Sequence, residues 1–246
     1  MWLSILLPNP LAQDAAATAI TFSVSLLWLR LVDWLVARGL LAQKLSRKII
    51  HIGTGPPYIL CWNLFSSAPY AAWLAALVPL AITAQFTLVG LGWLQDDAAV
   101  RAITRTGNRR EMLRGPLLYG LAFVVCTVVF WRHSPLGILA LMLLCGGDGL
   151  ADIAGRRWGT TRLPFNARKS WAGSAAMFAG SFIFGSIFVL LFAALGNYML
   201  ANALPHSLLA LAAVALAATL VEALPLPDVD NLTVTAAAVL AGSWLL

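Results

Sequence analysis

Long apolar runs separated by short polar segments organise this chain of 246 residues. A helix needs ~20 predominantly apolar residues to cross a bilayer, and about eight runs approach that length. They lie near 15–36, 49–65, 70–93, 115–131, 135–147, 172–195, 205–222 and 231–246. The pattern predicts an all-α integral membrane protein with seven or eight transmembrane helices, folded as a single polytopic domain over residues 1–246.

Two of the shorter runs carry features that change the expected helices. Pro56 and Pro57 lie inside the second run, so we expect that helix to be kinked or broken. The fifth run meets a polar stretch at Gly146, and we expect its helix to continue into that stretch. The N-terminal segment has no basic residues and is interrupted by prolines, so we do not interpret it as a cleaved signal peptide.

The composition agrees with a membrane protein. Hydrophobic residues make up 61% of the chain, charged residues only 11%, and the mean hydropathy is +0.84, whereas a soluble domain has about 25% charged residues. The net charge of +6 is not accompanied by a nucleic-acid-binding motif, so we expect no nucleic acid partner. The cysteines, Cys61, Cys126 and Cys145, lie in or beside apolar runs and are expected to be buried thiols.

The basic residues indicate an orientation in the membrane. Fourteen of the sixteen fall in three segments, at 38–48, 101–114 and 156–169, which follow the first, third and fifth predicted helices. Segments after odd-numbered helices share one face, and Lys and Arg gather in cytoplasmic loops. We therefore expect both termini on the non-cytoplasmic side. The acidic segment 222–231 falls on the same cytoplasmic face as the basic segments.

The most polar stretch of the chain, 145–174, contains two acids four residues apart, Asp148 and Asp152. This spacing places both carboxylates on one face of a helix, where their mutual repulsion is relieved if a cation lies between them. Mg²⁺ is typically bound by one or two carboxylates together with substrate phosphates. The alternative interpretation is a helix end with two solvated acids.

Cationic and small residues follow the acid pair. Arg156, Arg157, Arg168 and Lys169 are interspersed with glycines, and a helix is expected to start at Ser170. Cations and the N–H groups of a helix start are suited to phosphate, although such a segment can also be a loop of orientation charges. The adjacent acids favour a nucleoside triphosphate. The chain has no GxxxxGK[ST] loop, no protein-kinase motif set and no GxGxxG after a strand.

Three segments of the chain resemble one known family. GDGLADIAGRRWGTTRLPFNARKSWAGS is similar to the core motif of the CTP-dependent polyprenol kinase family, which includes dolichol, phytol, farnesol and CTP-dependent diacylglycerol kinases. RKIIH, from Arg47 to His51, is similar to the family's RKxxH element, and EALPLPDVDNLTV, from Glu222 to Val234, to its acidic element. The chain length and the form of these motifs are most similar to the phytol kinase branch.

The resemblance implies a reaction. CTP or UTP would donate its γ-phosphate to a membrane-embedded isoprenoid alcohol, with phytol as the first candidate, and phytyl phosphate and CDP would leave. The implied cofactor is Mg²⁺, and the implied partners are CTP, the lipid alcohol and membrane lipids. The catalytic segments would lie near 38–51, 145–174 and 222–231, on the cytoplasmic face. The sequence carries no indication of an oligomeric state.

The resemblance also assigns roles to individual residues. Asp148 and Asp152 are the expected metal ligands, and they form the catalytic set together with Lys169 and His51. The residues expected to bind nucleotide or phosphate are Arg47, Lys48, Arg156, Arg157, Asn166, Arg168, Ser170, Glu222, Asp230 and Asn231. Some alternatives remain open: Arg47 and Lys48 can be interfacial anchors, the acids of 222–231 can hold a second metal or the nucleoside, and Asp228 can be a solvated loop acid.

Other functions remain in competition. A CDP-diacylglycerol synthase-like cytidylyltransferase resembles the chain around the same acids and basic residues, but its C-terminal KD…HGG…DR pattern is absent. A transporter can also combine short or broken helices with membrane charges, but the sequence has no inverted repeat and its charges lie on one face. Within the kinase family, dolichol, farnesol, geranylgeraniol and diacylglycerol are alternative acceptors.

Overall fold

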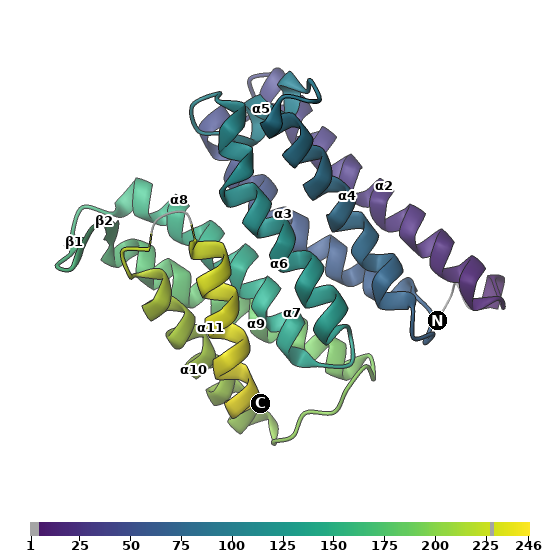
Figure 1. Cartoon of the computed structure of the whole chain (residues 1–246). Coiled ribbons are helices and arrows are strands. Elements are labelled where there is room, and N and C mark those ends of the chain that lie inside the picture. The colour runs from purple at the N-terminus through teal and green to yellow at the C-terminus, as the bar shows by residue number, and fades with distance from the viewer. Residues whose placement is uncertain (1–4, 227–228) are drawn as a thin grey trace. The chain divides into compact units, whose positions relative to one another are not determined.

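A computed structural model of the chain describes residues 5–226 and 229–246. In these residues the chain forms helices joined by short connections and one two-stranded sheet (Figure 1). Contacts divide the chain into two compact units, Met1–Val129 and Phe130–Leu246. The expectation of a single polytopic domain stays a prediction.

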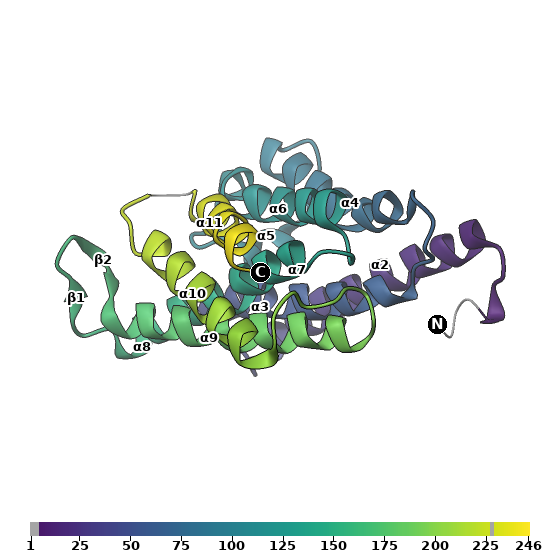
Figure 2. The ribbon, with the colours of Figure 1, turned by 90° about the horizontal axis from the view of Figure 1, so that it is seen from below.

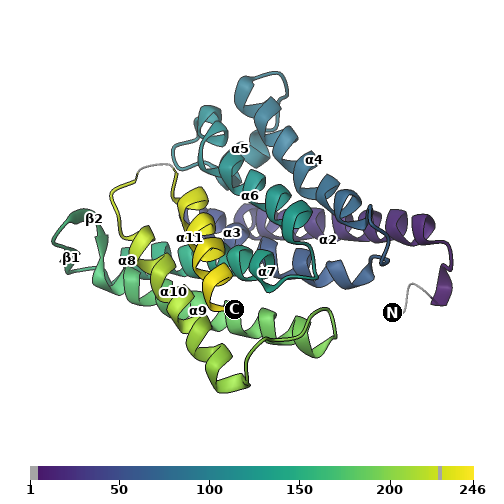
Figure 3. The same cartoon turned by 60° about the horizontal axis from the view of Figure 1, so that its bottom comes forward.

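The first unit is built around three long helices. Its elements are α2 (Pro10–Ala37), α3 (Gln43–Cys61), η1 (Trp62–Leu64), α4 (Ala71–Leu91), α5 (Asp97–Ile103), η2 (Arg109–Leu113) and α6 (Gly115–Phe130). Helix α2 packs against α3 and α4, and the short α5 packs against α3 (Figure 3). Asp14 of α2 is fully buried and accepts hydrogen bonds from the N–H of Ser66, at 2.6 Å, and from its hydroxyl, at 2.9 Å. These bonds attach α2 to the segment after η1.

Helix α3 continues through Pro56 and Pro57, so it is not broken there, and the expected alternative of a kink stays a prediction. Each proline lacks an N–H group and removes one backbone hydrogen bond of the helix. The neighbouring Tyr58 is 2% exposed, shares a 2.8 Å hydrogen bond with the hydroxyl of Thr127 in α6, and packs on Phe123 with ring centroids 5.5 Å apart. These contacts with α6 hold the helix on the C-terminal side of the prolines.

The second unit contains the most buried helix of the chain. Its elements are α7 (Pro135–Met142), the π-helical turn η3 (Leu143–Asp148), α8 (Gly149–Trp158), β1 (Arg162–Leu163), β2 (Asn166–Ser170), α9 (Trp171–Ala194), α10 (Leu204–Glu222) and α11 (Asp230–Leu245). Helical structure runs from Pro135 to Trp158 without interruption, so the expected continuation beyond Gly146 is confirmed. This segment packs against α9 and α11, and α9 in turn packs against α10 (Figure 2).

A β-hairpin, which the sequence did not indicate, connects α8 to α9. Strands β1 and β2 are antiparallel, with Arg162 opposite Ser170 and Leu163 opposite Asn166. Ser170 ends the hairpin and caps α9, because its hydroxyl oxygen accepts a 3.2 Å hydrogen bond from the N–H of Gly173. The predicted helix start at Ser170 is thereby confirmed.

Glycines allow the segment from η3 to α8 to pack closely on α9. A Cβ atom at Gly180 of α9 would lie 2.7 Å from the carbonyl oxygen of Gly146, and one at Gly147 would lie 2.2 Å from the hydroxyl oxygen of Ser181. Side chains are excluded at these positions because the two backbones approach one another. The glycines near the acid pair therefore have a packing role in addition to any role in binding.

Gly180→Ala is expected to lower the free energy of unfolding by about 1–3 kcal/mol, because the added methyl group meets the backbone of Gly146. The matched variant is Gly155→Ala in α8, where the nearest atom to the added carbon is the hydroxyl oxygen of Ser170 at 3.3 Å. That variant should change stability by less than about 1 kcal/mol, since alanine also favours helix. Thermal unfolding of both variants in detergent checks the difference, and equal effects would contradict the packing argument.

All eight predicted apolar runs form helices in the described part of the chain. Six helical segments are long and apolar enough to cross a membrane: Pro10–Ala37, Ala71–Leu91, Arg109–Phe130, Pro135–Trp158, Trp171–Ala194 and Leu204–Glu222. Helix α11 has 16 residues, which corresponds to ~24 Å and is shorter than the ~30 Å hydrocarbon core. The six long apolar segments indicate that the chain is an all-α membrane protein. The three cysteines are buried, as expected.

Candidate active site

The acid pair lies where the π-helical turn passes into α8. Asp148 ends η3 and Asp152 lies in the first turn of α8, with helical backbone angles between them. The expected common face is therefore present. The two carboxylates have different surroundings, because Asp148 is 6% exposed as a residue and the side chain of Asp152 is 25% exposed. π-Helical turns occur frequently at functional sites.

Arg156, one helical turn after Asp152, forms a two-point ion pair with it. The Nε atom lies 3.0 Å from Oδ2 of Asp152, and Nη2 donates to Oδ1 at 3.1 Å. This fork geometry matches the two oxygens of a carboxylate and equally those of a phosphate. The arginine side chain is 53% exposed, so the guanidinium is accessible for a phosphate ligand.

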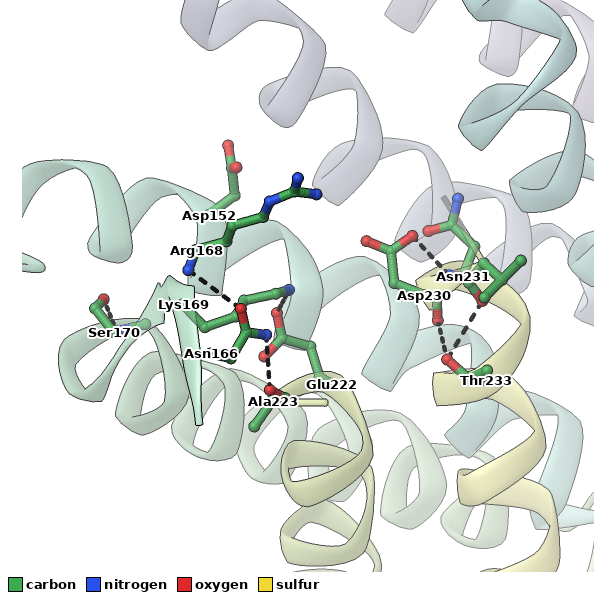
Figure 4. Close-up of polar contacts among 12 residues, drawn as sticks. Asp152, Asn166, Arg168, Lys169, Ser170, Glu222, Ala223, Asp230, Asn231 and Thr233 are labelled. Atoms are coloured by element: carbon green, nitrogen blue, oxygen red, sulfur yellow. Dashed lines mark hydrogen bonds and ion pairs between the residues drawn. The ribbon is translucent and has the colours of Figure 1, made fainter. Parts of the chain in front are cut away.

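Lys169 of β2 forms an ion pair with Glu222, the last residue of α10 (Figure 4). Burial by itself would lower the pKa of the Lys169 ammonium, but the carboxylates of Glu222, Asp148 and Asp230 raise that pKa above the ordinary lysine value. We call Asp148, Lys169, Glu222 and Asp230 the Lys169 cluster. Its members come from η3, β2, α10 and α11, and Glu222 is the one whose contact with Lys169 is direct, whereas Asp148 and Asp230 act on it electrostatically.

Asn166, expected to bind nucleotide or phosphate, makes hydrogen bonds within the protein. Its amide nitrogen donates to the backbone carbonyl of Ala223 at 2.9 Å, and its amide oxygen accepts from the N–H of Arg168 at 3.1 Å. Ser170 is also buried, at 2% exposure, and caps α9. Both residues support the hairpin that carries Lys169 (Figure 4).

The exposed arginines of this segment surround the hairpin. Arg157 is exposed, with its guanidinium 5.5 Å from the ring centre of Trp158, and the side chain of Arg168 is exposed on β2.

At the start of α11, the buried Asn231 donates its backbone N–H to the side chain of Asp230 at 3.1 Å. Asp228 lies outside the described residues.

The RKIIH element lies on α3, in the first unit. Lys48 is 6% exposed and Arg47 is half-buried. The ring of His51 packs on Tyr119 of α6 with centroids 4.3 Å apart, and the Tyr119 hydroxyl donates to the backbone carbonyl of His51 at 2.7 Å. The roles expected for Arg47, Lys48 and His51 stay predictions.

The acidic residues of the site suit a metal ion that is bound jointly by protein carboxylates and by substrate phosphates. Within residues 5–226 and 229–246, no group of three or more His, Cys, Asp or Glu side chains is placed to hold a metal ion. Asp148 and Asp152 supply two carboxylates on one face, which suits Mg²⁺ when substrate phosphates complete its coordination.

Sequence reasoning missed three features of this site. These are the hairpin, the pairing of Glu222 with Lys169, and the contact of Tyr119 with His51. A carboxylate at the end of an apolar helix needs a compensating partner, which was the available signal for Glu222. Nothing in the sequence indicated that this partner would be Lys169.

Several curated proteins are similar to this chain over most of its length. It is 43% identical over 235 residues to the probable phytol kinase 1, chloroplastic, of Oryza sativa subsp. japonica, covering 95% of this chain and 74% of that protein. It is 38% identical over 235 residues to phytol kinase 1, chloroplastic, of Arabidopsis thaliana, covering 95% of this chain and 77% of that protein. Farnesol kinase, chloroplastic, of Arabidopsis thaliana is 38% identical over 239 residues, covering 96% of this chain and 77% of that protein. No family model and no solved structure matches the chain.

The apolar helices and the charged cluster at their ends, together with these relatives, define a membrane-embedded lipid kinase. The chain belongs to the phytol kinase branch of the CTP-dependent polyprenol kinase family.

Proposed function

We propose that this protein transfers the γ-phosphate of CTP, or of UTP, to the hydroxyl group of phytol within the membrane. The similarity to phytol and farnesol kinases supports a prenyl alcohol as the acceptor. The observation that carries the proposal is the Lys169 cluster together with the Asp152–Arg156 pair, since cations and carboxylates gather there at the ends of apolar helices and Asp148 and Asp152 lie on one helical segment. A lipid alcohol and a water-soluble nucleotide can meet at such a place.

In the proposed reaction the alcohol oxygen forms a bond to the γ-phosphorus, and the bond from that phosphorus to the β,γ-bridging oxygen breaks. The nucleoside diphosphate leaves, and the hydroxyl proton passes to a carboxylate of the acid pair. Phosphoryl transfer depends mainly on positioning and on neutralising charge. Lys169 and Arg156 provide the positive charge, with Arg157 and Arg168 next to them.

Asp148 and Asp152 would hold Mg²⁺, which neutralises phosphate charge when bound. A metal–triphosphate complex offers both members of the Asp152–Arg156 pair a new partner, since the carboxylate suits the cation and the guanidinium suits the phosphate. His51, Arg47 and Lys48 remain proposed contributors from α3, and Asp230 and Asn231 from α11.

The proposed arrangement in the membrane follows from the basic segments. We propose a multi-pass protein with seven or eight transmembrane helices, both termini on the non-cytoplasmic side and the active site on the cytoplasmic face. The distribution of basic residues supports this orientation, because fourteen of sixteen lie in three segments that share one side.

A transfer assay on the detergent-purified full chain tests the proposed function. Labelled CTP, UTP, ATP and GTP are each combined with phytol, geranylgeraniol, farnesol, dolichol or diacylglycerol, with and without Mg²⁺. We expect the γ-label of CTP or UTP to move to phytol, and only when Mg²⁺ is present. Incorporation of the CMP group into a lipid would instead identify a cytidylyltransferase, and uptake without turnover by the chain reconstituted in sealed vesicles would identify a transporter.

A further inference from the structure

Glu222 is the most buried carboxylate of the Lys169 cluster. Its side chain is 3% exposed, and it ends α10, a helix apolar enough to cross a membrane. An ionised carboxylate in such a place is costly unless it is paired. Lys169 supplies the pairing charge, and its own side chain is 28% exposed. The buried acid and the more accessible cation therefore have different surroundings.

A second contact attaches the same strand to the same helix end. Asn166, three residues before Lys169, donates its amide N–H to the carbonyl of Ala223, the residue that follows Glu222. Figure 4 shows both contacts running from β2 to the end of α10. Two adjacent residues of the helix end thus hold two positions of the strand, which restricts the direction in which the Lys169 side chain can extend.

We propose that Glu222 is a positioning residue, which fixes the ammonium of Lys169 so that its remaining N–H groups face the phosphates of the nucleotide. This inference rests on the proposed function and deepens it. An ammonium group has three N–H donors, and the contact with Glu222 uses one. Lysine carries a long, flexible stem, so a buried partner that holds its end reduces the number of conformations to be lost on binding.

The sequence left open whether Glu222 binds a second metal or the nucleoside. The position of its carboxylate argues against direct contact with either ligand. Its carboxylate is almost entirely covered and already paired with a cation. Asp148 and Asp230 act electrostatically on the same ammonium from two other segments. Lys169 is more accessible than Glu222, with 28% of its side chain exposed against 3%, and Glu222 acts through it.

Glu222→Gln tests this role, because the amide keeps the shape of the carboxyl group and removes its charge. We expect the apparent KM for CTP to rise about ten- to hundredfold, the range of one hydrogen bond to a charged group, with the KM for phytol unchanged. Glu111→Gln is the matched control, since Glu111 is the other glutamate of the chain and lies in η2 of the first unit. Glu222→Asp, which keeps the charge, should recover part of the loss. Equal increases in both KM values would indicate a structural role only and overturn the proposal.

Chemical labelling of Lys169 gives a readout that does not need activity. The folded full-length protein is treated with an amine-acylating reagent, and labelling of Lys169 is quantified by mass spectrometry, with its labelling in the denatured protein as reference. We expect several-fold faster labelling in Glu222→Gln than in the wild type, and protection of the wild type by CTP. An unchanged labelling rate would overturn the positioning role. If Glu222→Gln does not fold, Glu222→Asp is compared in the same way.

Absence of phosphate transfer by the wild type would refute the proposed function, whereas the labelling result separately decides whether Glu222 holds Lys169.

Discussion

Asp148→Asn is expected to reduce kcat for phosphate transfer by roughly 10³-fold or more, the scale of a group that neutralises charge in phosphoryl transfer. Asparagine has nearly the same shape as aspartate but cannot supply an anionic ligand to Mg²⁺. Asp148 is 6% exposed and also acts on the Lys169 ammonium, so its loss would affect both the proposed metal and the cation that we propose faces the phosphates. The measurement is the initial rate of label transfer from CTP to phytol at saturating Mg²⁺.

Asp152→Asn is expected to give a large loss as well, because it removes the second carboxylate and the partner of Arg156. Asp97→Asn serves as control, since Asp97 is an exposed acid in the first turn of α5. Size-exclusion elution and thermal unfolding establish that each variant is folded. Near-normal turnover in both Asp148→Asn and Asp152→Asn would remove the metal-site hypothesis.

Lys169→Ala should have the second large effect, because it removes the cation at the centre of the Lys169 cluster. We expect kcat/KM for CTP to fall by roughly 10²- to 10³-fold, with a much smaller change in the KM for phytol. The variant also leaves Glu222 buried without its cation. Removing one member of a buried pair costs about 3–5 kcal/mol, and we expect the lower end because the lysine is 28% exposed.

A double variant separates the two consequences of losing Lys169. Lys169→Ala with Glu222→Gln removes both charges, and the free energy of unfolding should return most of the way to that of the wild type, since no buried charge remains unpaired. Transfer activity should stay low because the ammonium is still absent. Recovery of activity together with stability would show that Lys169 acts only as a structural ion pair.

The helices and several of their ends were predictable because their signals are local. Each apolar run became a helix, and Ser170 before an apolar run predicted the cap of α9. The hairpin was not predictable, because its strands have two and five residues and carry charged and small side chains in place of an apolar alternation. The break considered at Pro56 and Pro57 is absent from α3, where Tyr58 packs against α6, and the alternative of a kink stays a prediction.

Helical spacing predicted one feature of the candidate site, whereas the partners of its residues were not predicted. The common face of Asp148 and Asp152 followed from helical periodicity, but the Asp152–Arg156 pair, which has the same spacing of four, was not anticipated. Asn166 was expected to contact nucleotide, yet its amide bonds to Ala223 and Arg168 and supports the hairpin. A polar residue in a basic segment does not reveal by itself whether it faces a ligand or the backbone of its own loop.

The sequence alone determined that this is a helical membrane protein with most of its basic residues in three short segments, because hydropathy and charge distribution are properties of neighbouring residues. The tertiary structure decided which charges meet. Lys169 and Glu222 are 53 positions apart, and they pair because α9 packs against η3, α8 and α10 through contacts that include glycines such as Gly146 and Gly180. Such pairing depends on the packing of whole helices against one another, and no local pattern of residues specifies it.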